Sequence, residues 1–258
     1  GPQGIVHGTT ITVLNAARIK STGGPEGKLF VTAGLGGMSG AQPKAGNIAG
    51  VVSITAEINP KAAYKRHEQG WVDEITTKAD QAIDLALEFQ SEKRARSIAY
   101  LGNIVDLWER MVERDIHVDM GSDQTSLHNP WAGGYYPQGL SYEQANNMMA
   151  NNPEEFKVRI QATLKRHVKA VNALVKKGMY FFDYGNAFLL ESSRAGAEIM
   201  AEDGEHFRYP SYVQDIMGPM CFDYGFGPFR WVCASGNPSD LDKTDTIAEE
   251  VLERLKKN

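Results

Sequence analysis

The strongest constraint on the fold is an alternation of short apolar runs with helical patterns. The apolar runs are rich in β-branched or aromatic residues and lie at 28–34, 50–58, 96–102, 117–126 and 179–188. Between them, apolar residues recur at spacings of three and four over 61–90, 103–115, 141–150 and 153–177, which indicates amphipathic helices. Strands that alternate with helices predict an α/β fold, with a doubly wound, mostly parallel sheet and helices on both faces.

Two segments at the ends add less to the fold prediction. Residues 5–20 (IVHGTTITVLNAARIK) are β-branched like a strand yet end like a helix, so both interpretations stay open. Residues 244–258 predict a helix with basic residues near its C-terminus. With 258 residues, the chain can bury the core of one large α/β domain, alone or with an appendage.

The composition excludes several functional classes. The net charge of −5, without any basic stripe, argues against a nucleic-acid surface. The chain shows neither a long apolar run nor a signal peptide, so membrane and secretion readings are disfavoured. Two cysteines, Cys221 and Cys233, are too few for a disulfide framework or a four-thiolate metal site, and the histidines lack metal-binding spacing. We therefore expect a cytoplasmic protein without a metal site.

A glycine-rich loop follows the first predicted strand. Gly34-Leu35-Gly36-Gly37-Met38-Ser39-Gly40 has the Gly-x-Gly spacing of a Rossmann-like dinucleotide loop, with Ser39 where the third glycine usually stands. Glycines there let a diphosphate approach the backbone at a helix N-terminus. A tight turn with close helix packing would give the same pattern, so both interpretations stay open.

An acidic residue supports the cofactor interpretation. Glu57 ends the next strand, about twenty residues after the loop, where an acid binds the ribose hydroxyls of NAD. A carboxylate there disfavours NADP, although a solvated acid at a strand end remains the alternative. Further polar clusters end the later strands, at 102–103, 122–126 and 183–186, and ligands of open α/β sheets bind at those carboxyl ends.

Several long motifs resemble the urocanase (urocanate hydratase) family. They run in order along the whole chain, beginning with GPQGIVHG, and include TAGLGGMSGAQPKAG, SDQTSLHNP, GGYYPQG, FFDYGNAF, FRYPSYVQDIMG and GFGPFRWVCASGNPSDL. The resemblance implies a lyase of histidine degradation that adds water to urocanate to give imidazolonepropionate. It implies tightly bound NAD⁺ that acts as an electrophile toward the imidazole ring, without net redox chemistry.

The resemblance also assigns site residues by matching motif. The cofactor contacts it implies are Gln3, Gly36, Gly37, Met38, Ser39, Glu57, Asn103, Ile104, Gln124, Thr125, Ser126, Leu127, His128, Tyr135, Tyr136 and Tyr184. From the residues alone, Arg230 is either a carboxylate anchor or an arginine stacked on Trp231 or Phe229; the resemblance favours contact with the urocanate carboxylate. Two positions depart from the bacterial pattern, which has glycine at Ser39 and arginine at Ala62.

Family members are considerably longer than this chain. The resemblance therefore implies that residues 1–258 are the NAD-binding domain, with 1–20 and 222–258 nearest the remaining core. It places the active-site cysteine outside this chain, so we expect no catalytic residue here and no hydration of urocanate by this chain alone. The full-length family forms homodimers. The alternatives are an NAD-dependent dehydrogenase, for which no Tyr-x-x-x-Lys pair is present, and a non-catalytic dinucleotide-binding module.

Overall fold

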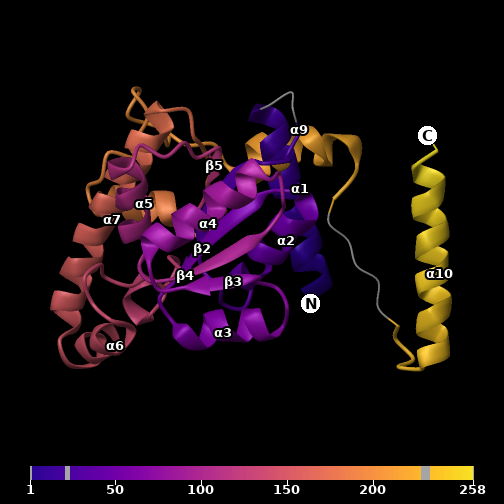
Figure 1. Ribbon diagram of the computed structural model, residues 1–258, viewed down its shortest axis with the longest axis horizontal. Helices are drawn as coiled ribbons and strands as arrows, with labels where there is room; N and C mark the ends of the chain where they lie inside the picture. Colours follow the sequence, from indigo (N-terminus) through magenta and orange to yellow (C-terminus); the bar gives the residue numbers. More distant parts are fainter. Residues whose placement is uncertain (1, 21–23, 228–232, 258) are drawn as a thin grey trace. The chain divides into compact units, whose positions relative to one another are not determined.

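A six-stranded parallel sheet forms the centre of the computed structural model, which describes residues 2–20, 24–227 and 233–257 (Figure 1). Its strand order is β3-β4-β2-β1-β5-β6. The strands are β1 (Leu29–Ala33), β2 (Val52–Glu57), β3 (Glu74–Thr76), β4 (Ser97–Leu101), β5 (Met120–Gly121) and β6 (Tyr180–Phe181). From β1 the chain builds outward through β2 and β4, then returns to add β5 and β6 on the other side. The order therefore reverses between β1 and β5, the place where such sheets bind ligands.

Helices cover both faces of the sheet because alternate strand residues point to opposite sides. On one face, Leu29, Val31 and Ile54 pack in the main core with α4 (Ala79–Ser91), α5 (Ile104–Glu113) and α7 (Pro153–Lys176). On the other face, Phe30, Met120 and Phe182 pack against α1 (Pro2–Lys20) and the end of α2 (Gln42–Ala49). The predicted doubly wound α/β fold is confirmed.

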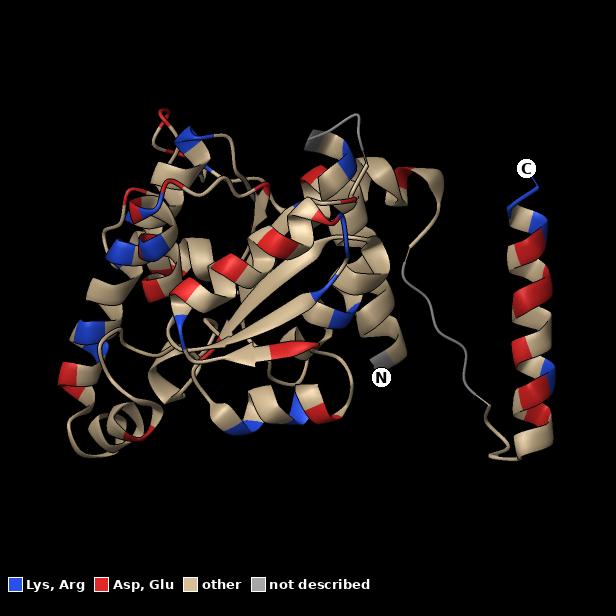
Figure 2. Ribbon diagram, in the orientation of Figure 1, with Lys and Arg blue, Asp and Glu red and all other residues tan. Residues whose placement is uncertain are grey.

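Further helices complete the described residues. They are the 3₁₀ helices η1 (Ser39–Ala41), η2 (Pro130–Ala132) and η4 (Phe222–Tyr224), the π-helix η3 (Tyr212–Met217), and the α-helices α3 (Pro60–Glu68), α6 (Tyr142–Asn151), α8 (Phe188–Arg194), α9 (Gly218–Met220) and α10 (Pro238–Leu255). The chain divides into two compact units, residues 1–227 and 228–258. The second contains α10, which carries acidic and basic residues along its length (Figure 2). No helix within the described ranges has the length and apolarity needed to cross a membrane.

The prediction of continuous helix over 61–90 is wrong. Gly70, with a φ of 67°, follows the end of α3, and Glu74–Thr76 then pairs with β4 as the edge strand β3 before α4 begins. Residues 5–20, left open between strand and helix, form part of α1. The pairing of α1 with α2 and the buried face of Val13, Ala16 and Ala17 favour the helix over the local β propensity.

Candidate functional site

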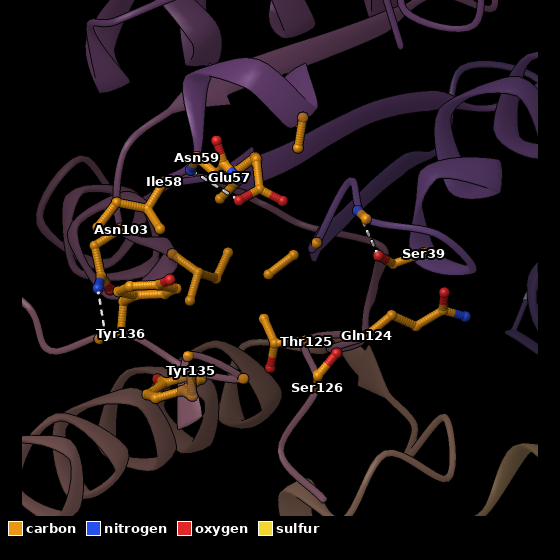
Figure 3. Close-up of a pocket in the computed structure, with 18 of the residues that line it drawn as sticks. Ser39, Glu57, Ile58, Asn59, Asn103, Gln124, Thr125, Ser126, Tyr135 and Tyr136 are labelled. Carbon is orange, nitrogen blue, oxygen red and sulfur yellow. Dashed lines mark hydrogen bonds between the residues drawn. The ribbon is translucent and has the colours of Figure 1, made fainter. Parts of the chain in front are cut away.

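A pocket opens at the carboxyl ends of β1, β2 and β4 and beside the loop that follows β5 (Figure 3). It therefore lies where the strand order reverses, as the sheet topology requires. Its walls come from four segments: the glycine loop, the end of β2 with the start of α3, the turn before α5, and the segment from Gln124 to Tyr142. The lining residues are Ala33, Gly34, Gly36, Ser39, Ala56, Glu57, Ile58, Asn59, Ala62, Gly102, Asn103, Ile104, Gln124, Thr125, Ser126, Gly133, Gly134, Tyr135, Tyr136 and Tyr142.

Gly34 fixes the sharp turn that starts the glycine loop. Its φ is 98°, and a Cβ there would lie 2.9 Å from both the Gln124 carbonyl oxygen and the Ser39 Oγ. Its amide donates to the Ala56 carbonyl at 2.8 Å, which keeps the loop against the end of β2. Only glycine meets the conformational and the spatial demand together.

Ser39 performs a structural task at the position where the pattern usually has glycine. Its Oγ accepts a hydrogen bond from the Gly36 amide at 3.0 Å, so the side chain closes the turn from inside the loop. The hydroxyl is short enough to do this without filling the space beside Gly36, whose absent Cβ has only the Ser39 Oγ within 4 Å, at 3.6 Å. The serine is therefore compatible with close approach of a ligand at Gly36.

Glu57 connects the end of β2 to the loop and to α3. One carboxyl oxygen accepts from the Leu35 amide at 2.7 Å and the other from the Asn59 amide at 2.9 Å. Burial raises the pKa of Glu57, and the backbone amides of Asn59, Leu35 and Ile58 offset part of that rise. Because a carboxylate has about four acceptor positions and three backbone amides use three of them, the group can still receive one ligand hydroxyl in the pocket.

Asn103 joins α5 to the loop that carries Tyr135 and Tyr136. Its Oδ1 accepts from the Val105 amide at 2.9 Å, which caps the N-terminus of α5, and its Nδ2 donates to the Tyr136 carbonyl at 2.9 Å. Gly134 lets this loop pack closely, because a Cβ there would lie 2.1 Å from the Ser126 carbonyl oxygen. These two hydrogen bonds place Asn103 and Tyr136 in the same wall of the pocket.

Behind Tyr135 lies a fully buried histidine. The Trp108 indole N–H donates to His167 Nε2 at 3.1 Å, and the Tyr135 hydroxyl lies 2.9 Å from His167 Nδ1. Burial lowers the pKa of His167 to about 3, so the ring is neutral at neutral pH. Because an indole N–H can only donate, the ring proton must be on Nδ1, where it donates to Tyr135. The cluster thus holds Tyr135 in the wall of the pocket.

Asp123 is a second buried titratable group, at the end of β5. Its Oδ1 accepts from the Thr125 amide at 3.0 Å and from Asn186 Nδ2 at 2.7 Å, while its Oδ2 has no hydrogen-bond partner among the described residues. Burial raises the pKa of Asp123 to about 6. Its contacts orient the loop that carries Thr125 and join that loop to the segment after β6.

The structure brings most of the sequence-predicted cofactor contacts into one pocket. Those that line it are Gly36, Ser39, Glu57, Asn103, Ile104, Gln124, Thr125, Ser126, Tyr135 and Tyr136. Gly37 and Met38 are exposed on the adjoining loop, His128 is exposed, and Leu127 is fully buried in the core. Gln3 is exposed on α1, and Tyr184 stacks on Tyr212 with ring centroids 4.6 Å apart. Arg230 lies outside the described residues.

Sequence reasoning missed Arg66 on α3, which contacts the glycine loop from the side of that helix. It also assigned no contact to part of the lining, namely Asn59, Ala62, Gly133, Gly134 and Tyr142. The one available signal was Asn59-Pro60, a helix start directly after the acid at the end of β2. That start places the first turn of α3, including Ala62, at the pocket.

Together, the reversed strand order and the glycine loop at the pocket define an α/β domain of the Rossmann-like class. Comparison with known families agrees: the family model described as the urocanase Rossmann-like domain matches residues 1–216, and that of the urocanase C-terminal domain matches residues 219–258. This chain belongs to the urocanase family. The resemblance drawn from its motifs is thereby confirmed.

Curated relatives match nearly the whole chain. It is 56% identical to a probable urocanate hydratase of Caenorhabditis elegans, over 99% of this chain and 39% of the relative. It is 57% identical to a probable urocanate hydratase of Dictyostelium discoideum, over 99% of this chain and 38% of the relative. It is 53% identical to the urocanate hydratase of Homo sapiens, over 98% and 38% respectively. The chain thus spans less than half the length of these relatives.

Proposed function

We propose that this chain is the NAD-binding part of a urocanate hydratase. The observation that carries the proposal is the glycine loop at the point of strand reversal. Gly34 turns the chain sharply, and Gly36 leaves the backbone open on the pocket side. The loop then enters η1 and α2, and a helix N-terminus favours a bound anion. These residues fit a dinucleotide diphosphate.

The remaining walls fit the other parts of a dinucleotide. The Glu57 carboxyl group would accept from the ribose hydroxyls next to the adenine, while Ile104 and Ala62 offer apolar surface nearby. Beyond β5, the loop from Gln124 to Ser126 and the Tyr135 wall would enclose the nicotinamide half. When bound, NAD⁺ supplies an electrophilic ring for the addition of water to urocanate.

Urocanate as the substrate rests on the family and on its relatives, which are named urocanate hydratases. In this proposal the residues described here bind and orient the cofactor. Arg230 is retained as the proposed contact for the urocanate carboxylate. Tyr184, Leu127, His128 and Gln3 are proposed to support the cofactor site from outside the pocket lining.

The test is binding of NAD⁺ and NADP⁺ to the purified protein by calorimetry, together with identification of any dinucleotide released on denaturation. We expect NAD⁺ to bind at least tenfold more tightly than NADP⁺, because Glu57 stands where the 2′-phosphate would lie. Glu57→Gln should weaken NAD⁺ binding and reduce that preference, whereas Glu88→Gln, on the exposed face of α4, should change neither. The proposal would be contradicted if the unaltered protein bound both dinucleotides equally tightly, or if it bound neither of them.

A further inference from the structure

Arg66 is a nearly buried cation that contacts the glycine loop. It lies in the last turns of α3 and is only 9% exposed. Its Nε donates to the Leu35 carbonyl at 3.2 Å, and its Nη2 donates to the Gly36 carbonyl and, at 3.5 Å, to that of Gly37. One guanidinium group thus binds three consecutive carbonyl groups of the loop.

The surroundings hold Arg66 in this position. The guanidinium lies over the Trp71 ring, 5.3 Å from its centroid, and its Nη1 donates to Gln69 Oε1 at 2.8 Å. Gly40 makes the approach possible, because a Cβ on Gly40 would lie 2.1 Å from Arg66 Nε. The close approach of the arginine therefore requires the absence of a side chain at Gly40.

The charge of Arg66 is not neutralised by a carboxylate. No ion pair within the described ranges involves Arg66, and its partners there are neutral carbonyl, amide and aromatic groups. Burial lowers the pKa of Arg66 from its usual range. A nearly buried positive charge without a counter-ion costs free energy, and an anion bound at the loop would offset part of that cost.

The three carbonyl contacts also set the direction of the loop amides. In a trans peptide the N–H points opposite to the preceding carbonyl, so the amides of Gly37 and Met38 face away from Arg66. Among the described residues neither amide has an acceptor, and both residues are exposed. The loop therefore presents two free donors on one side while its carbonyls are bound on the other.

We infer that Arg66 is a positioning residue for the dinucleotide diphosphate. It binds the carbonyls of Leu35, Gly36 and Gly37, turns the amides of Gly37 and Met38 toward the phosphate oxygens, and supplies positive charge behind them. This inference rests on the proposed function, because it assigns the diphosphate to the glycine loop. It predicts that Arg66 acts on ligands that carry phosphate and not on ligands that lack it.

The experiment compares ADP-ribose with adenosine as ligands of the purified protein, measured by calorimetry at two salt concentrations. Arg66→Gln should weaken ADP-ribose binding at least thirtyfold and reduce its salt dependence, with adenosine affinity changed less than threefold. Arg66→Lys keeps the positive charge but lacks the planar guanidinium group with its several N–H donors, so we expect an intermediate loss of ADP-ribose affinity. Arg94→Gln is the matched control, because Arg94 also lies over an aromatic ring, that of Phe89, on α4.

A second variant separates positioning from general damage to the fold. Gly40→Ala keeps Arg66 but places a Cβ where its guanidinium lies, and should show the same selective loss. In the Arg66→Gln background, Gly40→Ala should reduce ADP-ribose binding no further. Equal losses for both ligands, or unchanged ADP-ribose binding in Arg66→Gln, would overturn the inference. Failure of the unaltered protein to bind ADP-ribose would instead contradict the proposed function.

Discussion

The two halves of the pocket use buried polar groups in opposite ways. Around the glycine loop, the side chains of Glu57 and Arg66 bind backbone groups and leave amides free at the surface. Beyond β5, Asp123 and His167 lie behind the pocket lining, and their hydrogen bonds hold the lining residues Thr125 and Tyr135 in place. The first half therefore offers free amides to an anion, whereas the second presents a wall of neutral side chains, Gln124, Thr125, Ser126, Tyr135 and Tyr136. The difference matches the central diphosphate of a dinucleotide at the glycine loop and its nicotinamide half beyond β5.

The largest effect is expected at Gly34, in the half of the pocket that contains the glycine loop. Gly34→Ala adds a Cβ to a residue with a φ of 98°, within 2.9 Å of the Gln124 carbonyl oxygen, so strain and a clash arise together. We expect a loss of about 2–4 kcal/mol in the free energy of unfolding and loss of measurable NAD⁺ binding. Urea denaturation and calorimetry would measure the two effects.

Gly139→Ala is the matched control for this substitution. Gly139 has a φ of 84° but nothing within 4 Å of the added Cβ, so only the backbone strain of about 1 kcal/mol should remain. If both variants lost equal stability, the close packing of Gly34 between Ser39 and Gln124 would not be what fixes the loop.

The second test concerns pH and the enclosed half. His167 has a pKa of about 3 when folded, below its unfolded value of 6.5. The unfolded state therefore binds more protons as the pH falls, and stability is lost by about 2 kcal/mol between pH 7 and 5. Asp123 has a folded pKa of about 6, above its unfolded value of 3.8. It acts in the opposite direction, adding about 1 kcal/mol over the same range.

Two variants separate these opposing contributions. His167→Gln should reverse the pH dependence, leaving a gain of about 1 kcal/mol between pH 7 and pH 5, and Asp123→Asn should steepen the loss to about 2 kcal/mol, as measured by urea denaturation at the two pH values. Glu88→Gln, which is exposed on α4, serves as the control. The same dependence in both variants as in the unaltered protein would mean that neither group is enclosed as described.

The smallest expected effect is at the boundary between the halves. Asn103→Ala removes the cap of α5 and the tie to the Tyr136 carbonyl, for a loss of about 1 kcal/mol in stability. Asn103→Asp keeps the capping oxygen but not the donor to Tyr136, so it should retain most of the stability and weaken NAD⁺ binding severalfold. Asn237→Ala, which removes the cap of α10, should leave NAD⁺ affinity unchanged. If Asn103→Ala lost NAD⁺ affinity but Asn103→Asp did not, the hydrogen bond from Asn103 to the Tyr136 carbonyl would be dispensable for binding.

The sequence predicted the centre of the sheet better than its edges. Strands β1, β2 and β4 are buried on both faces, so their continuous apolar runs identified them. Strand β3 was missed because it has only three residues, lies at the edge of the sheet and starts with the exposed Glu74. It also stands between two helices whose apolar residues have similar spacing. Strands β5 and β6 are shorter than their apolar runs, since only two residues of each pair in the sheet.

The site was predictable where function depends on residues close in sequence. The loop from Gly34 to Ser39 and Glu57 could be predicted from spacing because one strand–helix–strand unit, β1–α2–β2, brings them together. Arg66 could not, since its role depends on the direction in which α3 returns over the loop. Likewise, the buried contact of Trp108, His167 and Tyr135 joins three segments that no local pattern connects.

The short pairing of β5 and β6 has a consequence for how the domain opens. Between β1 and β2 five residue pairs are in register, but β5 matches only two residues of β1 and two of β6. The amides of Ser122 and Gln124 add hydrogen bonds to the carbonyls of Val31 and Ala33. The regular pairing on the β5 side is nevertheless shorter, so side-chain packing contributes more of its cohesion. Local unfolding should begin on that side and leave the other half formed.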